Sequence, residues 1–132
     1  MKIPERIIVV DDDSINNMFC KYVIKQALEE KSEIVMFAVP QKALNYINAE
    51  YKSKDTSTVM FLDINMPVLS GWDVLEEMKK CDSRVMSNIR VFMLSSSVDP
   101  NDKKKAKEFD MVKGFYEKPL TVEAIQSICE MD

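Results

Sequence analysis

The sequence predicts an α/β fold, a doubly wound sheet of five parallel strands. Two observations predict it. Short apolar runs alternate with segments of helical periodicity, and five strand–helix units in succession indicate a parallel sheet with helices on both faces. The runs at 7–10, 59–62 and 91–94 are apolar at four successive positions. Such runs are typical of strands that are buried on both faces.

The first half of the chain is expected to form three strands and two helices. After the strand at 7–10, Ser14 can cap a helix. Its apolar side chains follow i, i+3, i+4, i+7 spacing at Ile15, Met18, Phe19 and Tyr22. A second strand is expected at 34–37, and Pro40 then suits the first turn of a second helix. The polar stretch 52–57 predicts a loop that leads into the third strand.

The second half continues the alternation. A loop at 66–71 is followed by a helix with an apolar face at 74–78, after which comes the fourth strand. Asp-Pro at 99–100 is expected to open a short polar helix that runs to about Lys107. A fifth strand near Phe115 precedes the last helix, which Thr121 can cap.

Length and composition indicate one globular domain over residues 1–132, with no effector domain. No linker, repeat or low-complexity segment interrupts the 132 residues. The net charge is −4 and no basic stripe spans the chain, so direct nucleic-acid binding is not expected. The apolar stretches are too short to span a membrane, and residues 1–6 lack the apolar region of a signal peptide.

Cysteine and histidine content narrow the chemistry further. The three cysteines are widely spaced and odd in number, which favours reduced thiols in a cytoplasmic protein over a disulfide framework or a zinc site. The chain contains no histidine. Imidazole catalysis and a phosphohistidine within this polypeptide are therefore both excluded.

Polar residues stand at or just beyond the ends of four predicted strands. Asp11 and Asp12 follow the first, Asp63 the third and Ser95 the fourth, and Lys118 comes shortly after the fifth. Ligands in open α/β sheets bind at the carboxyl ends of the strands. Three carboxylates, a hydroxyl and an ammonium group are therefore expected to converge on one edge of the sheet.

The three carboxylates predict a metal site. Carboxylates this close to one another raise one another's pKa values unless a cation neutralises their charge. Ligand sets made only of oxygen favour magnesium, manganese or calcium over zinc. Capping of the first helix by residues 11–13 is the simpler alternative, but it gives no role to Asp63. A calcium-binding EF-hand loop fails, because Ile15, Asn16 and Tyr22 occupy positions that need a ligand, a glycine and a glutamate.

The other two groups suggest that the site handles phosphate. Magnesium held by few carboxylates keeps positions open for phosphate oxygens. Lys118 can supply a positive charge and Ser95 a hydroxyl donor to such oxygens. Asp63 is then the expected nucleophile, since carboxylates form aspartyl-phosphate intermediates. Taken alone, Lys118 could be an ordinary surface lysine and Ser95 part of an ordinary turn. These alternatives do not explain why Asp-Asp, Asp, Ser and Lys follow one another at strand ends.

The chain resembles the receiver domain of two-component response regulators, the family of the bacterial chemotaxis regulator. The matching stretches are Ile8-Val9-Val10-Asp11-Asp12-Asp13, Leu62-Asp63-Ile64-Asn65-Met66-Pro67 with Ser70-Gly71, Phe92-Met93-Leu94-Ser95-Ser96, and Lys118-Pro119. The resemblance covers nearly the whole chain. It implies a flavodoxin-like (βα)5 sheet with strand order 2-1-3-4-5.

The resemblance also implies the metal ligands and the phosphoacceptor. Asp63 looks like the phosphoacceptor. Asp12 and Asp63 would bind Mg²⁺, or alternatively Mn²⁺, through their side chains. Asn65 would contribute its backbone carbonyl, and Asp11 would bind through water.

The remaining matched positions are those that, in this family, contact the phosphoryl group or change conformation when it is added. Ser95, with Lys118, would contact the phosphoryl group, and Phe115 falls at the family's aromatic switch position. The Lys118–Pro119 bond falls where the family commonly has a cis peptide. Two departures stand out: Phe115 replaces the usual tyrosine, although Tyr116 follows it, and Ser95 replaces the commoner threonine.

The implied function is that of a phosphorelay receiver. It would take a phosphoryl group from a phosphohistidine on a sensor histidine kinase or a histidine phosphotransfer protein. Phosphorylation would switch a protein-binding surface near the helix at 100–107, the strand at Phe115 and the last helix. The four lysines at 103, 104, 105 and 107 would attract an acidic downstream partner, which the sequence does not identify. The alternative is that they form only a solvated helix face.

Two rival functions fit the residues less well. Haloacid-dehalogenase-like phosphohydrolases carry Asp-x-Asp after the first strand, whereas here the nucleophile follows the third strand and Asn65 stands two residues beyond it. A receiver that no longer takes phosphate would not need Asp12, Asp63, Ser95 and Lys118. We therefore expect a signalling domain that catalyses only its own phosphorylation and dephosphorylation.

Overall fold

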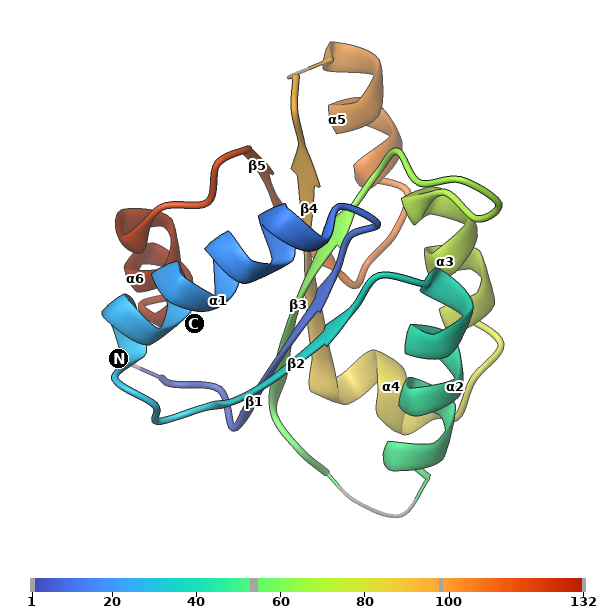
Figure 1. The fold of residues 1–132 in the computed structure, drawn as a ribbon. Coiled ribbons are helices and arrows are strands. Elements are labelled where there is room, and N and C mark those ends of the chain that lie inside the picture. The colour runs from blue at the N-terminus through green and yellow to red at the C-terminus, as the bar shows by residue number, and fades with distance from the viewer. Residues whose placement is uncertain (1, 53–54, 98, 132) are drawn as a thin grey trace.

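The computed structural model describes residues 2–52, 55–97 and 99–131. Strands and helices alternate along the chain (Figure 1). They are β1 (Arg6–Val10), α1 (Ser14–Leu28), β2 (Glu33–Phe37), α2 (Pro40–Glu50), β3 (Thr58–Asp63), α3 (Gly71–Met78), α4 (Ser83–Asn88), β4 (Ile89–Ser95), α5 (Pro100–Ala106), β5 (Val112–Glu117) and α6 (Val122–Cys129). The predicted loop at 52–57 lies partly outside the described residues.

The five strands form one parallel sheet in the order β2-β1-β3-β4-β5. This confirms the predicted fold class and strand order. β3 lies at the centre and is buried along its whole length. Its last residue, Asp63, pairs in register with Leu94 of β4, and the preceding Leu62 pairs with Val10 of β1. The register therefore brings the carboxyl ends of the three central strands to one edge of the sheet.

Helices cover both faces of the sheet (Figure 1). α1 and α6 lie on one face, where they pack on alternate strand residues such as Ile7, Phe61 and Phe92. α2, α3, α4 and the segment that follows α5 lie on the other, against Met60 and Met93 among others. The interiors of β1, β3 and β4 are thus covered on both faces, which explains their uninterrupted apolar runs. Within the described residues, no helix is both long and apolar enough to cross a membrane.

The apolar side chains whose spacing predicted the first helix do not form the buried face of α1. They are exposed, at 78% for Ile15, 70% for Met18, 43% for Phe19 and 62% for Tyr22. The buried residues are Asn17, Cys20, Val23, Ile24 and Leu28. This second set also has helical spacing, and it packs against α6 and the sheet. Both sides of α1 carry apolar residues, so periodicity alone could not choose between them.

The helix starts show which local predictions hold. Ser14 is the first residue of α1, and the cap is Asp13, whose carboxylate accepts from the backbone N–H of Ile15 and Asn16. Pro40 opens α2 and Thr121 caps α6, as predicted. One helix was not predicted: α4, which begins after Asp82, whose side chain caps it, and leads into β4.

Candidate functional site

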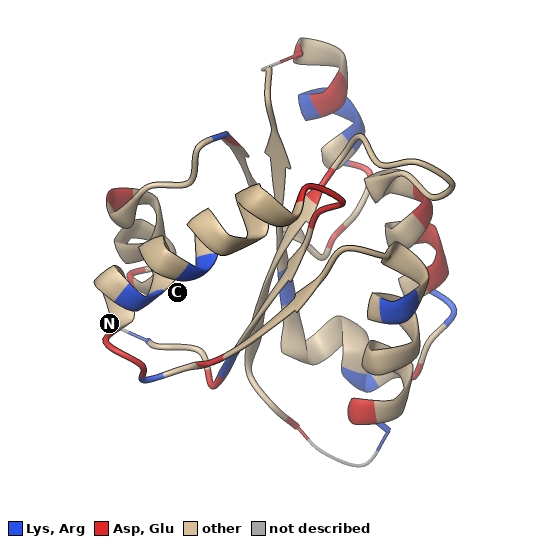
Figure 2. Ribbon diagram, viewed as in Figure 1, with Lys and Arg blue, Asp and Glu red and all other residues tan. Residues whose placement is uncertain are grey.

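The site lies at the edge of the sheet where the strands end. Asp11 follows β1, Asp63 ends β3, Ser95 ends β4 and Lys118 follows β5. Asp11 and Asp63 are buried, and Asp12 is exposed. One carboxylate oxygen from each of the three aspartates lies within 4.8 Å of the others. Figure 2 shows the resulting concentration of acidic residues in the loop between β1 and α1.

Lys118 reaches into this acidic cluster. Its Nζ lies 2.7 Å from Asp11 Oδ2 and 3.2 Å from Asp63 Oδ1. Its backbone N–H donates to the carbonyl of Ser95 at 2.7 Å, and its peptide bond to Pro119 is cis. Burial would lower the pKa of Lys118, but hydrogen bonds and charge interactions with Asp11 and Asp63 raise it above its ordinary value. Lys118 is therefore a fixed cation.

Lys118 only partly compensates the negative charge at Asp63. Burial and the negative charge of Asp11 raise the pKa of Asp63 to about 6, against the opposing effect of Lys118. Three carboxylates thus share one ammonium group. Oxygen ligands with an excess of negative charge are what a hard divalent cation prefers. The residues present fit a Mg²⁺ or Mn²⁺ ion.

A hydrogen-bond network fixes Asp11. Its Oδ1 accepts from the backbone N–H of Asp13 at 2.9 Å, and its Oδ2 accepts from Asn16 Nδ2 at 2.6 Å. Asn17 Nδ2 donates to the backbone carbonyl of Asp11 at 2.8 Å. The sequence interpretation gave Asn16 and Asn17 no role at the site. Their place in the first turn of a helix that directly follows the aspartates was the signal that could have identified them.

The Ser95 hydroxyl is engaged within its own loop. It donates to the carbonyl of Ser97 at 2.6 Å and accepts from the Ser97 backbone N–H at 3.2 Å. Contact between Ser95 and a phosphoryl group on Asp63 would require the hydrogen bond that this hydroxyl donates to the Ser97 carbonyl to break. The loop after β4 is therefore an element that such a group can rearrange.

The loop after β3 packs closely under the site. Gly71, the first residue of α3, donates its N–H to the carbonyl of Ile64 at 2.8 Å. A Cβ at this position would lie 2.6 Å from the backbone oxygen of Asp63. Only glycine permits this approach, which ties the start of α3 to Asp63. Asn65, in the same loop, is exposed.

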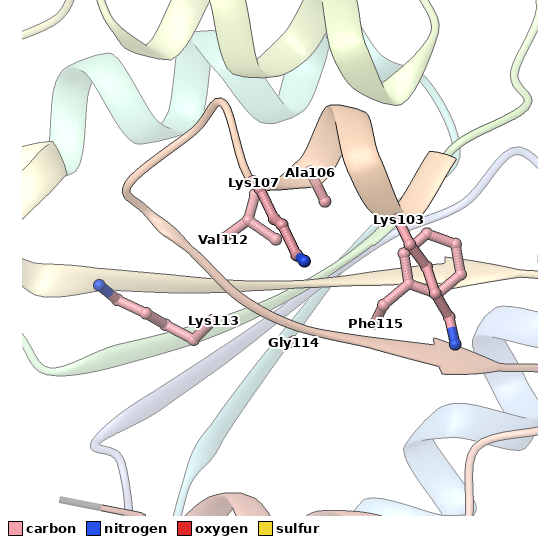
Figure 3. A pocket seen from close by; sticks show the side chains of 7 residues that line it. All are labelled: Lys103, Ala106, Lys107, Val112, Lys113, Gly114 and Phe115. Carbon is pink, nitrogen blue, oxygen red and sulfur yellow. The ribbon is translucent and has the colours of Figure 1, made fainter. Parts of the chain in front are cut away.

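A second feature lies away from the acidic cluster, between α5 and β5. Figure 3 shows this pocket, whose lining residues are Lys103, Ala106, Lys107, Val112, Lys113, Gly114 and Phe115. Phe115 is half-buried and packs against the core on the α5 side of the sheet. The pocket is thus apolar at its base and basic at its rim.

Comparisons with known proteins agree with this geometry. Residues 7–130 match the family model of the response regulator receiver domain. The structure is similar to a two-component response regulator from Cytophaga hutchinsonii, with 30% identity, a TM-score of 0.85, and coverage of 97% of this chain and 95% of that one. A response regulator receiver protein from Dyadobacter fermentans is 24% identical, with a TM-score of 0.81 and 93% of both chains covered. A chemotaxis protein from Vibrio cholerae is 23% identical, with a TM-score of 0.71 and 96% of both chains covered. A search of curated proteins found no match.

Proposed function

Because the chain belongs to the response regulator receiver domain family, a family of signalling domains, we propose that Asp63 accepts a phosphoryl group from a phosphohistidine of a partner protein. The observation that carries the proposal is the position of Asp63. It ends the fully buried central strand, with Lys118 3.2 Å away and two further aspartates alongside. The chain has no histidine, so the donor is another molecule, a histidine kinase or a histidine phosphotransfer protein.

The reaction is a direct transfer. A carboxylate oxygen of Asp63 attacks phosphorus, the phosphorus–nitrogen bond of the donor breaks, and the imidazole leaves with the bonding electrons. Negative charge is spread over the phosphoryl oxygens during transfer, and Lys118 is placed to stabilise it. Attack of water on phosphorus later returns Asp63 to a carboxylate and releases phosphate.

We propose that the transfer requires a divalent cation, because the site carries more negative than positive charge. Asp11, Asp12 and Asp63, with the backbone carbonyl of Asn65, would hold Mg²⁺, and Mn²⁺ has similar ligand preferences. When bound, the ion would neutralise phosphoryl oxygens. A phosphoryl group adds about −1.5 to −2 charge among carboxylates that already repel. Lys118 alone cannot offset that much charge.

The donor protein is proposed to dock on the exposed apolar side of α1. Ile15 and Phe19 lie in the first turns of the helix, directly after the aspartates. Large apolar side chains that face solvent beside a reaction site indicate a protein-binding surface. Asp63 is 4% exposed, so a protein that delivers a phosphohistidine to it must also cover the surrounding surface.

The output surface is proposed to be the α5–β5–α6 side. Release of Ser95 from Ser97 would move the loop after β4, which leads into α5. The basic rim of the pocket there, including Lys103 and Lys107 (Figure 3), would attract an acidic partner and speed its association at low salt. If phosphorylation leaves this surface unchanged, the chain instead acts as a phosphate sink that drains a kinase.

The proposed function can be tested with acetyl phosphate and Mg²⁺. The wild-type protein should gain the mass of one phosphoryl group, and Asp63→Asn should gain none, because an amide is not a nucleophile here. Circular dichroism would show that the variant remains folded. Continuous release of phosphate from phosphomonoesters would indicate a phosphohydrolase, and labelling of Asp63→Asn would place the acceptor elsewhere.

A further inference from the structure

Asn16 is a polar residue at the site to which the proposed reaction gives no role. Its side-chain amide donates to Asp11 Oδ2 at 2.6 Å, and Lys118 Nζ lies 2.7 Å from the same oxygen. The other oxygen of Asp11 accepts from the backbone N–H of Asp13 at 2.9 Å. Asp11 is fully buried, so its charge depends on these protein donors together with the metal proposed above.

Lys118 is shared unevenly between two carboxylates. Its Nζ lies 2.7 Å from Asp11 and 3.2 Å from Asp63. During phosphoryl transfer the ammonium group is needed at the oxygens bound to phosphorus, on the Asp63 side. A buried carboxylate that loses its cation needs another donor. The lysine can therefore turn towards Asp63 more readily when Asp11 Oδ2 keeps the hydrogen bond from Asn16, whatever contact Asp11 also makes with the metal.

We propose that Asn16 is a positioning residue that holds Asp11 and thereby leaves Lys118 free for the phosphoryl group; the inference rests on the function proposed above. Asn16 is uncharged, so it satisfies Asp11 Oδ2 without competing for the phosphoryl oxygens. With Asn16 removed, Lys118 is the remaining side-chain donor to that oxygen within the described residues. Asp11 then retains the lysine, and transfer slows.

The local structure directs the Asn16 side chain to this task. The Asp13 cap fixes the first turn of α1 by accepting the N–H groups of Ile15 and Asn16. Side chains on a helix tilt toward its N-terminus, so the Asn16 amide points back to Asp11. The neighbouring Asn17 instead holds the Asp11 backbone carbonyl. The two asparagines thus fix different parts of the same residue.

The test compares two substitutions at Asn16 with a matched control. Asn16→Leu keeps the approximate size and removes the donor, and Asn16→Asp replaces the donor with a second carboxylate. Asn48→Leu makes the same change at an exposed position of α2. The maximal rate of acetyl-phosphate labelling and the concentration that gives half that rate are measured at saturating Mg²⁺, under conditions where circular dichroism shows every variant folded.

We expect Asn16→Leu to lower the maximal rate about tenfold, because a misplaced catalytic group costs rate rather than ligand affinity. The half-saturating concentration should change little, Asn16→Asp should be slower still, and Asn48→Leu should match the wild type. A maximal rate for Asn16→Leu equal to that of Asn48→Leu would overturn the inference. So would faster labelling of Asn16→Asp than of Asn16→Leu. A wild-type protein that takes no label would overturn the proposed function itself, and this inference with it.

Discussion

At the scale of single residues, the electrostatics of Asp63 couple the site to stability. Its pKa of about 6, raised by burial and by Asp11, lies above the value near 3.9 of an unfolded chain. The folded state therefore binds the proton more tightly than the unfolded state does between these pH values. The free energy of unfolding contributed by this group falls as pH rises from about 4 to 6, and stays lower above that. The charged carboxylate of Asp63 therefore lowers the stability of the fold at neutral pH.

We expect Asp63→Asn to be more stable than the wild type at pH 7.5 without metal, by on the order of 1–2 kcal/mol. The amide removes a charge that the fold accommodates poorly. The difference should shrink towards pH 4, where Asp63 is protonated, and also on addition of Mg²⁺, which would stabilise the wild type by binding the folded state. Urea unfolding in EDTA and in Mg²⁺ measures both effects. Lower stability of the variant at pH 7.5 in EDTA would contradict the charge argument.

Val68 is a strained residue in the loop after β3. It has a φ of 70° and is 98% exposed. A branched side chain in the left-handed region costs roughly 1–2 kcal/mol, and here no burial offsets it. Val68→Asn should raise the free energy of unfolding by about 1 kcal/mol, because asparagine tolerates this conformation. Thermal and urea unfolding test this, and a less stable variant would show that the loop depends on valine.

At the scale of elements, α1 illustrates the limits of periodicity. Residues 14–28 present two apolar faces with helical spacing, so the sequence alone favours neither. The choice depends on where α6 and the sheet lie, which is tertiary information. The unpredicted α4 has a similar cause: it contributes one buried residue, Val85, which is too weak a signal for a helix. By contrast, the strand runs were identified because burial on both faces leaves a continuous apolar segment.

A pair of substitutions on α1 should separate its two faces. Val23→Ala removes a buried side chain and should lower the free energy of unfolding by about 2 kcal/mol. Met18→Ala, at a 70% exposed position, should change it by less than about 0.5 kcal/mol. If the exposed face receives the donor, Met18→Ala should also slow phosphotransfer from a phosphohistidine protein. Labelling of this variant by acetyl phosphate should be normal. Equal destabilisation by the two substitutions would contradict the observed orientation.

At the scale of the whole molecule, the sequence predicted the convergence of groups on the sheet edge better than it predicted their mutual contacts. The positions of Asp11, Asp63 and Lys118 follow from strand ends alone, since parallel strands bring those ends together. The contacts of Asn16 with Asp11 and of Ser95 with Ser97 depend on helix capping and loop conformation. Residue order along the chain placed Asn16 in the first turn after the aspartates, but it carries little information about the contact of Ser95 with Ser97.

Trp72 offers a reporter of any change that spreads from Asp63 to α5. It is the only tryptophan of the chain, and it follows Gly71 beneath the site. Its ring stacks on Phe109 at a centroid distance of 6.0 Å, and Lys105 Nζ lies 5.4 Å from the ring centroid. Phosphorylation should therefore change the emission of Trp72 in the wild type and leave that of Asp63→Asn unchanged. Labelled wild-type protein with unaltered emission would show that α5 does not respond, which favours the phosphate-sink role.

The complete burial of β3 has a consequence for how long a phosphoryl group could last. Asp63 ends this strand, and the next N–H, that of Ile64, donates to Leu94 on β4. Amides in such a central position exchange with deuterium only when most of the fold opens. Local breathing of the backbone should therefore not expose an acyl phosphate on Asp63 to bulk water. Water would instead reach the acyl phosphate through brief openings between the side chains at the entrance of the site. Substitutions of those side chains should therefore change the lifetime of the phosphoryl group more than changes in the stability of the fold do.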